Sequence, residues 1–433
     1  MKRSVMQQLY EWKQNANRKP LILQGARQVG KTWLMKTFAE QAFDKYVYVN
    51  FENNQSLVDL FKKDFDMNRI LLELQIATRE RITQDTLLLF DEIQEVERGV
   101  TSLKYFQELL PHQPIIAAGS LLGIAMHRNN SFPVGKVDFV TIYPMSFSEF
   151  VEANGEGMLL EQLQSGNWDI LATFGSRLEN LLRMYYFVGG MPEAVADFIK
   201  NKDLRSVRTI QNAILDSYDR DFSKHAPQTE VPRLRMIWRS IVGQLSKENK
   251  KFIYGFIKEG ARAKDFELAI EWLKDAGLIY RVNRTKKAQM PLSAYEDFSA
   301  FKLFLLDVGL LCAMANLPEQ TLLQKNNFIV EFKGALTEQY VMQQLATLKR
   351  KDIYYWSQDN SQGEIDFLVQ YSNKILPIEV KAENNLQAKS MRMFIQRNPE
   401  LHGLRFSMSN LQEQEWLTNY PLYAVESAIK NIF

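Results

Sequence analysis

The sequence predicts an α/β protein whose N-terminal third is built on a parallel β-sheet with helices on both faces. Short apolar runs alternate with amphipathic stretches through the first 150 residues, which is the pattern of βαβ units. The alternation stops near Pro144, and helical periodicity dominates from there to about residue 317. A second α/β pattern follows. The 433 residues therefore divide into several domains, because a single hydrophobic core rarely grows beyond about 250–300 residues.

Five apolar runs are the expected strands of the N-terminal sheet: Pro20–Gln24, Tyr46–Phe51, Thr86–Phe90, Pro114–Gly119 and Asp138–Tyr143. Helical patterns lie between them, for example at Lys31–Gln41 and Leu57–Ile70. Because strands that alternate with helices pair in parallel, the carboxyl ends of these strands are expected at one edge of the sheet.

The composition, with 46% hydrophobic and 24% charged residues, is that of an average soluble globular protein. A net charge of +2 gives no overall basic field, so any contact with nucleic acid must come from a local patch. The single cysteine, Cys312, is expected to be a small buried hydrophobe, and it excludes intrachain disulfides. The four histidines show no metal-ligand spacing.

Targeting signals are not apparent. No apolar run reaches the roughly 18 residues that span a bilayer. The basic N-terminus lacks the continuous apolar segment of a signal peptide. The sequence therefore predicts a cytoplasmic protein without a membrane partner.

The first chemically specific motif matches G-x-x-x-x-G-K-[ST] and consists of Gly25, Ala26, Arg27, Gln28, Val29, Gly30, Lys31 and Thr32. Its glycines let backbone N–H groups turn toward phosphate oxygens, and the following helix adds the partial positive charge of its N-terminus. Lys31 is predicted to reach the β- and γ-phosphates of ATP, and the Thr32 hydroxyl to ligate Mg²⁺. Trp33 completes the predicted nucleotide-binding set. An ordinary glycine-rich turn is disfavoured because the motif stands between a strand and a helix.

Two carboxylates follow the buried run Thr86–Phe90. Asp91 is predicted to belong to the Mg²⁺ shell, and Glu92 to orient or deprotonate the attacking water. A helix-capping acidic pair is the alternative. Ser120 ends the strand Ile115–Gly119 and is predicted to reach the γ-phosphate or the water, with an N-cap as the alternative.

These motifs stand in order with four others: Ala-Gly-Ser-Leu-Leu-Gly at 118–123, Tyr-Pro-Met-Ser-Phe-Ser-Glu-Phe at 143–150, Gly-Gly-Met-Pro-Glu at 189–193 and Leu-Phe-Leu-Leu-Asp-Val-Gly-Leu at 303–310. Together with Leu-Phe-Asp-Glu-Ile-Gln at 89–94, they resemble the prokaryotic AAA+-type ATPases that carry a C-terminal domain of uncharacterised function. The resemblance covers nearly the whole chain. It implies a P-loop AAA+ core at 1–150, a helical lid at 151–215, a winged-helix-like domain at 216–317 and a small α/β restriction-endonuclease-like domain at 318–433.

The winged-helix prediction rests on Phe252–Glu259, a turn at Gly260, and the helix Lys264–Asp275, with Leu278–Val282 and Phe301–Leu306 as a small sheet. Contact with DNA is disfavoured because the would-be recognition helix is acidic, with Asp265, Glu267, Glu271 and Asp275. A packing role is favoured instead.

Two sets of basic residues are open in their role. A helical stripe, formed by Arg233, Arg235 and Arg239, is compatible with surface ion pairs, phosphate contacts or a second-sensor arginine. Lys136 stands where the family usually has arginine. A solvated loop lysine is favoured over a weaker charge-stabilising finger.

Four C-terminal residues resemble the PD-(D/E)-x-K nuclease arrangement: Glu338 on a helix, Asp366 on a strand, and Glu379 and Lys381 on the next strand. Strand periodicity places the last two on one side. The resemblance implies that the three acids hold Mg²⁺ and that Lys381 stabilises charge while metal-activated water attacks a phosphodiester. The alternative is a nuclease fold that survives only as a binding or packing module.

The predicted function is Mg²⁺-dependent ATP binding and hydrolysis, coupled to a nuclease-like domain that acts on DNA or RNA. The alternative is an ATP-driven switch whose C-terminal domain only binds a partner. AAA+ relatives often form rings, so a homo-oligomer and a monomer both remain open.

Overall fold

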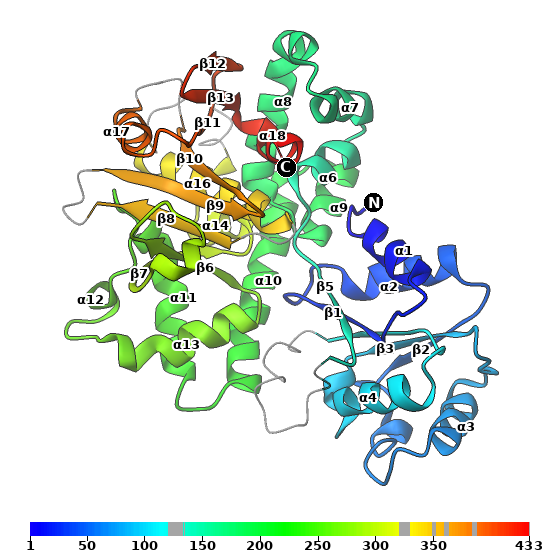
Figure 1. Ribbon diagram of the computed structural model, residues 1–433. Coiled ribbons are helices and arrows are strands. Elements are labelled where there is room, and N and C mark those ends of the chain that lie inside the picture. The colour runs from blue at the N-terminus through cyan, green and yellow to red at the C-terminus, as the bar shows by residue number, and fades with distance from the viewer. Residues whose placement is uncertain are drawn as a thin grey trace. The chain divides into compact units, whose positions relative to one another are not determined.

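The computed structural model describes residues 1–119, 133, 135–319, 330–348, 352–358, 363–382 and 388–432. Two units are distinguished, each with its own sheet (Figure 1). One consists of Lys2–Tyr143 with Asp275–Leu278. The other consists of Pro144–Lys274 and Ile279–Phe433, together with Met1. In the described part of the chain, no helix has the length and apolar character needed to cross a membrane.

A five-stranded parallel sheet organises the N-terminal unit, which confirms the predicted α/β fold class. Its order is β2-β3-β4-β1-β5. The strands are β1 (Leu21–Gln24), β2 (Tyr46–Asn50), β3 (Leu87–Asp91), β4 (Ile115–Ala118) and β5 (Asp138–Thr141). They agree with the five predicted strands to within a few residues. Because all pairs are parallel, the ends of β1 and β3 lie at the same edge, separated by β4 alone.

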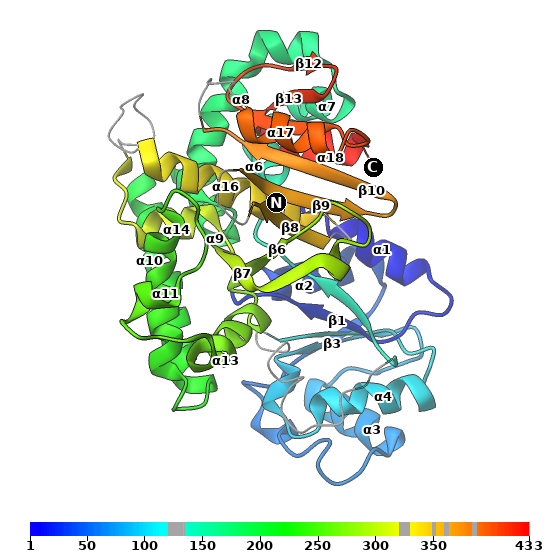
Figure 2. The same cartoon turned by 60° about the vertical axis from the view of Figure 1, so that its left-hand side comes forward.

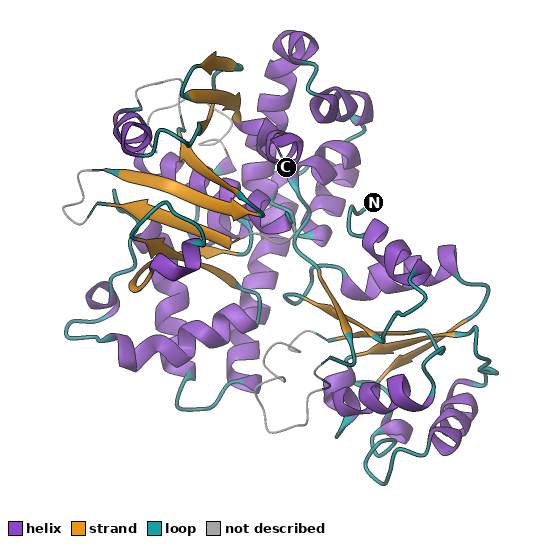
Figure 3. Cartoon of the chain, viewed as in Figure 1, coloured by secondary structure: helices purple, strands orange, loops and turns teal. Residues whose placement is uncertain are grey.

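Helices lie on both faces of this sheet (Figure 3): α1 (Met6–Gln14), α2 (Lys31–Ala42), α3 (Met67–Thr78) and α4 (Gly99–Leu109). One face forms a core in which Phe90 of β3 contacts Phe51 and Phe106 at ring-centroid distances of 5.5 and 5.8 Å. The helix expected at Leu57–Ile70 instead begins at Met67. The Asp66 side chain accepts hydrogen bonds from the Asn68 and Arg69 amides, which is the bonding of an N-cap.

The second unit holds an eight-stranded mixed sheet of order β12-β13-β11-β10-β9-β8-β6-β7. Its strands are β6 (Ile279–Thr285), β7 (Glu296–Leu305), β8 (Asp352–Ser357), β9 (Glu364–Tyr371), β10 (Lys374–Val380), β11 (Gly403–Ser407), β12 (Gln412–Gln414) and β13 (Leu417–Pro421). The β6–β7 hairpin, predicted as the small sheet of a winged helix, pairs through β6 with β8 in parallel. One sheet thus extends across the domain boundary predicted at residue 317. Pairing with β8 gives hydrogen-bond partners to backbone groups that an isolated β6–β7 hairpin would leave unpaired at its edge.

The helices of this unit are α6 (Phe147–Ala153), α7 (Gly157–Ser165), α8 (Trp168–Val188), α9 (Pro192–Asn201), α10 (Leu204–His225), α11 (Val231–Leu245), α12 (Tyr254–Ile257), α13 (Ala263–Asp275), α14 (Val308–Met314), α16 (Val330–Thr347), α17 (Lys389–Arg397) and α18 (Val425–Ile432). Helices α10 and α11 lie side by side (Figures 1 and 2). Helix α16 packs against β7 and β10, and α17 against β9. The capping box of Ser146 and Glu149 starts α6.

A buried aspartate joins two of the sequence motifs. Asp307 accepts hydrogen bonds from the Gly190 amide at 2.6 Å, the Leu310 amide at 3.0 Å and the Gln343 side chain at 2.9 Å. Gln343 in turn accepts from the Val308 amide at 2.8 Å. The Gly-Gly-Met-Pro-Glu and Leu-Leu-Asp-Val-Gly motifs therefore meet at one carboxylate that helix α16 supports.

We expect Asp307→Ala to lower the free energy of unfolding by about 2–5 kcal/mol, because two buried amides and the Gln343 amide would lose their acceptor. Differential scanning calorimetry should show a lower melting temperature. The control is Asp352→Ala, which removes an exposed acid of β8. Equal melting temperatures for the two variants would contradict this role.

Candidate nucleotide-binding and hydrolysis site

The loop between β1 and α2 carries the predicted phosphate-binding motif. Gly25 has a φ of 142°, and a Cβ at this position would lie 2.2 Å from the Ile142 carbonyl oxygen. Gly30 is the N-cap of α2 in the left-handed conformation, with a φ of 92°. Any residue other than glycine would therefore be strained at either end of the loop. The N-terminus of α2 opens directly onto it, as the predicted chemistry requires.

Lys31 folds back over this loop. Its ammonium group donates hydrogen bonds to the carbonyl oxygens of Gly25 at 2.9 Å and Ala26 at 2.7 Å. Burial lowers the pKa of Lys31 to about 8, although the charges of Glu92 and Asp91 act in the opposite direction. Two neutral carbonyl groups thus hold the cation, and among the described residues no carboxylate forms an ion pair with it.

Asp91 ends β3 and receives two hydroxyl groups on one oxygen. The Thr32 hydroxyl lies 2.8 Å from Asp91 Oδ2, and the Tyr48 hydroxyl lies 2.9 Å from the same atom. Burial raises the pKa of Asp91 above its usual value. Two oxygen ligands at 2.0–2.1 Å in an Mg²⁺ octahedron are about 2.9 Å apart, so the spacing of Thr32 and Asp91 fits this ion.

Glu92 adopts a left-handed backbone conformation with a φ of 51°. Its side chain makes no capping hydrogen bond to the short 3₁₀ turn that follows, which disfavours the helix-capping alternative. Instead, its Oε2 accepts a hydrogen bond of 2.5 Å from the Gln94 amide. A positive φ at a residue other than glycine costs free energy and persists only where the surrounding structure enforces it. Such residues cluster at functional sites.

Sequence reasoning missed three residues at this site: Tyr48, Gln94 and Arg3. Arg3 donates hydrogen bonds to the carbonyl oxygens of Val29 at 3.1 Å and Tyr143 at 2.6 Å. Tyr48 was recognisable only as a polar position in a strand. Its approach to Asp91 depends on the pairing of β2 with β3, which the sequence does not state.

The other predicted residues of this site have different surroundings. Trp33 is 46% exposed in the first turn of α2. Ser120 lies outside the described residues. Lys136 pairs with Glu108 at 3.1 Å and is partly exposed, consistent with a solvated loop lysine.

Most of the remaining charged groups that sequence analysis singled out form ion pairs. Arg235 pairs with Asp219 at 2.8 Å, and Arg233 pairs with Glu230. Arg239 lines a hollow of about 850 Å³ beside α10 and α11. On the would-be recognition helix α13, Glu267 and Glu271 both pair with Arg281 of β6, at 2.9 and 3.3 Å. These contacts favour the packing role over contact with DNA.

The C-terminal acids lie in the second unit. Asp366 accepts a hydrogen bond of 2.7 Å from the Val380 amide. The register of β9 and β10, continued by one pair beyond Ile378 and Phe367, sets Glu379 opposite Asp366, so both face one side. Lys381 lies 3.1 Å from Glu379.

Glu338 contacts two lysines that the sequence analysis did not identify. Lys250 lies 2.6 Å from its Oε1, and Lys302 lies 3.5 Å from its Oε2. Burial would raise the pKa of Glu338, but the two ammonium groups hold it below its usual value. Burial and the charge of Glu338 raise the pKa of Asp366 to about 7. Within the described residues, no three His, Cys, Asp or Glu side chains are grouped so as to hold a metal ion.

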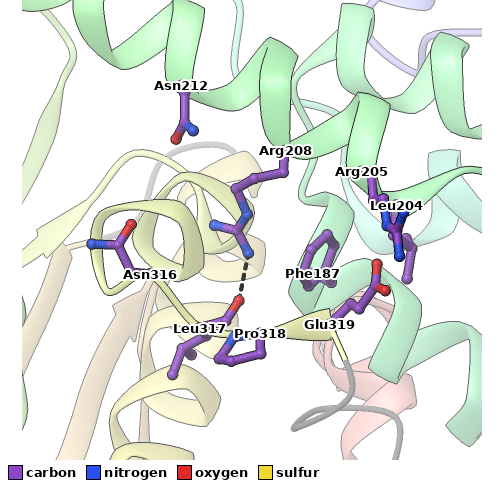
Figure 4. A pocket seen from close by; sticks show the side chains of 9 residues that line it. All are labelled: Phe187, Leu204, Arg205, Arg208, Asn212, Asn316, Leu317, Pro318 and Glu319. Atoms are coloured by element: carbon purple, nitrogen blue, oxygen red, sulfur yellow. Dashed lines mark hydrogen bonds between the residues drawn. The ribbon is translucent and has the colours of Figure 1, made fainter.

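A separate hollow of about 420 Å³ lies in the second unit between the end of α8, the start of α10 and residues 316–319 (Figure 4). Arg208 lies over the Phe187 ring, 4.4 Å from its centroid, and donates to the Leu317 carbonyl at 2.9 Å. None of the predicted site residues lines this hollow.

Comparisons with protein families agree with the geometry of the N-terminal unit. Residues 17–151 match the model of an AAA domain. Residues 179–321 and 333–424 match two domains of unknown function, DUF8612 and DUF4143. Most of the N-terminal unit thus matches an AAA domain, in agreement with its P-loop geometry, and two segments that match families without an assigned activity follow it. No curated protein matches the chain at a significant level.

Solved structures show only a partial resemblance. The Walker-type ATPase PABY2304 of Pyrococcus abyssi is 15% identical with a TM-score of 0.45, covering 72% of this chain and 94% of that one. The ORC1 protein of Aeropyrum pernix, solved with DNA, is 13% identical with a TM-score of 0.26, covering 74% and 93%. The RuvB branch migration motor of Thermotoga maritima is 14% identical with a TM-score of 0.29, covering 63% and 85%. At these values no property of the three proteins is transferred to this chain.

We expect Tyr48→Phe to raise the Mg²⁺ concentration for half-maximal ATP hydrolysis by about 3–10-fold, because one hydrogen bond that positions Asp91 is lost. Steady-state phosphate release, measured over a range of Mg²⁺ at fixed ATP, reports this shift. Tyr46→Phe on the same strand is the matched control. An unchanged Mg²⁺ dependence in Tyr48→Phe would show that its hydroxyl does not position Asp91.

Proposed function

We propose that the chain is an Mg²⁺-dependent ATPase whose N-terminal domain binds and hydrolyses ATP and drives a change in the remaining chain. The observation that carries this proposal is the 2.8 Å approach of the Thr32 hydroxyl to Asp91, beside a glycine loop that already holds a lysine ammonium. An oxygen pair suited to Mg²⁺ thus adjoins a loop suited to phosphate.

The nucleotide-binding set proposed for this loop comprises Gly25, Ala26, Arg27, Gln28, Val29, Gly30, Lys31, Thr32 and Trp33. Its backbone N–H groups and the N-terminus of α2 would attract the phosphate oxygens. Lys31 would exchange its two carbonyl acceptors for the β- and γ-phosphates, because a charge-assisted hydrogen bond is stronger than a neutral one. Arg3 would stabilise the loop through its hydrogen bond to the Val29 carbonyl oxygen.

Thr32 and Asp91 would hold Mg²⁺, which neutralises charge on the phosphates when bound. Tyr48 would keep Asp91 in position for the metal through its hydrogen bond to Oδ2. Glu92 would orient the attacking water and accept its proton, and Gln94 would restrain the Glu92 carboxylate. Ser120 is proposed to reach the γ-phosphate or this water.

For the C-terminal part, we propose the role of a partner-binding module, so that the whole chain acts as an ATP-driven switch. The alternative is metal-dependent cleavage of DNA or RNA by Glu338, Asp366, Glu379 and Lys381. Asp366 and Glu379 share a face, which supports the alternative, but Glu338 is paired with Lys250, a residue outside the nuclease arrangement. The pairing favours the non-catalytic role.

Two variants separate binding from hydrolysis in the N-terminal domain. Lys31→Ala should weaken ATP binding at least about tenfold, because a charge-assisted phosphate contact contributes about 1.5–3 kcal/mol.

Glu92→Gln should bind ATP normally but hydrolyse it about 10²–10⁴-fold more slowly, because it keeps the size of the side chain and removes the base. Titration calorimetry and phosphate release give the two values. ATP affinity unchanged by Lys31→Ala, or normal turnover in Glu92→Gln, would remove the corresponding assignment.

The C-terminal alternative is tested by incubating the protein with DNA and RNA in Mg²⁺ or Mn²⁺, with and without ATP. We expect no cleavage above that of Asp366→Ala. Cleavage that is lost in both Asp366→Ala and Lys381→Ala would establish the nuclease and overturn the non-catalytic role. ATP hydrolysis measured on the same samples reports separately on the N-terminal domain.

A further inference from the structure

Three carboxylates and two lysines gather where helix α16 meets the eight-stranded sheet. Lys302 of β7 is fully buried and lies 2.5 Å from Glu364 and 3.5 Å from Glu338. Lys250, from the segment between α11 and α12, lies 2.6 Å from Glu338. Asp366 belongs to the same group, and its Oδ2 accepts the Val380 amide at 2.7 Å.

Two lysines offset two of the three carboxylate charges of this cluster without an added ion. A divalent metal brings two positive charges to a site of two or three carboxylates, and it needs oxygens that are free to approach within 2.0–2.1 Å for Mg²⁺. Here Lys250 and Lys302 already supply two positive charges. Lys250 takes up Glu338 Oε1 and Lys302 takes up Glu364 Oε1, whereas Glu338 Oε2 has Lys302 at 3.5 Å. A metal ion would have to displace buried ammonium groups that would then lack a partner, which is strongly unfavourable.

Both lysines are held on anchored backbone. Lys302 lies in a paired position of β7, opposite Val282 of β6. The segment that carries Lys250 is fixed close by, since the Phe252 amide donates to the Phe301 carbonyl at 2.8 Å. Gln244 of α11 also bonds the backbone of Ile253 at both its N–H and its C=O. The fold therefore anchors the backbone from which both lysines reach the acids.

The third predicted acid, Glu379, also lies beside positive charge. Glu379 is buried, and its Oε1 pairs with Lys381. The register of β10 and β11 sets Arg405 beside Glu379, and Arg405 is itself 1% exposed. Lys381 belongs to the nuclease arrangement, and Arg405 adds a positive charge beside Glu379 from outside it.

We infer that this cluster is a metal-independent ion-pair network, in which Lys250 and Lys302 supply the charge that a divalent cation supplies in the nuclease arrangement it resembles. The network ties the segment after α11 to helix α16 and to β9. This inference goes beyond the proposed ATPase and does not depend on it. In this inference the buried acids stabilise the fold and hold no metal for phosphodiester cleavage.

The first test measures Mn²⁺ binding by the loss of the free-ion signal in electron paramagnetic resonance. The full-length chain with Asp91→Ala is used without nucleotide, so that the P-loop metal site is removed. We expect no binding that depends on Glu338 up to about 1 mM Mn²⁺, a concentration at which even weak carboxylate sites fill. Binding that disappears when Glu338→Gln is added would overturn the inference, whereas binding that Glu338→Gln leaves unchanged lies elsewhere and agrees with it.

The second test asks whether the lysine is needed in the absence of any metal. In EDTA, Lys250→Met should lower the melting temperature by about 5 °C or more, because Glu338 loses its closest partner in a buried site. Lys251→Met, at the neighbouring exposed position, is the matched control. Adding Glu338→Gln to Lys250→Met should recover at least half of the loss. A melting temperature for Lys250→Met equal to that of Lys251→Met would overturn the inference, as would full rescue of wild-type stability only by Mn²⁺.

ATP binding by the Lys250→Met variant is measured in parallel. If the network inference fails, ATP binding by Lys250→Met stays unchanged. If the ATPase proposal fails, Lys31→Ala binds ATP as tightly as the wild type. The two proposals are thus tested by different variants in different parts of the chain.

Discussion

The nucleotide site depends on one constraint, the parallel order of β3, β4 and β1 in the N-terminal sheet. Parallel pairing places the ends of these strands at one edge, so the loop after β1 and the carboxylate at the end of β3 can meet. The direct consequence is the hydrogen bond between Thr32 and Asp91 at 2.8 Å, across 59 residues of sequence. Without this register, the glycine loop and the acids would be separate features with no shared chemistry.

The two clusters of charge in the molecule differ in how their carboxylates are satisfied. At the P-loop, Lys31 bonds to neutral carbonyl groups, and Asp91 accepts hydrogen bonds from the Thr32 and Tyr48 hydroxyl groups. Those contacts are weak enough to be exchanged for phosphate and metal. In the second unit, Glu338 and Glu364 are bonded to buried ammonium groups, which are costly to remove. Acids of similar type therefore suit a ligand site in one case and a structural network in the other.

The second unit is also organised by Asp307, which connects three segments through main-chain and side-chain donors. Its carboxylate accepts hydrogen bonds from the Gly190 amide after α8, the Leu310 amide in α14 and the Gln343 side chain in α16. Burial raises the pKa of Asp307, and its hydrogen bonds act against this rise. Two motifs that resembled those of a family thus have a physical explanation in this chain: each supplies a part of one buried polar network.

The sequence by itself determined the fold class and the position of the phosphate loop. Contiguous residues determine both, because the strand, the glycine loop and the helix follow one another directly at residues 21–42. Lys250 and Lys302 could not be predicted in the same way. They reach Glu338 and Glu364 across 88 and 62 residues, and nothing in their neighbours along the chain marks them as partners. Tyr48 likewise meets Asp91 only because β2 pairs with β3, and β6 joins the C-terminal sheet only because β8 lies beside it. Local sequence fixes which chemical groups are available, whereas the tertiary structure decides which charges face each other, and that decides whether an acid is free to bind a metal.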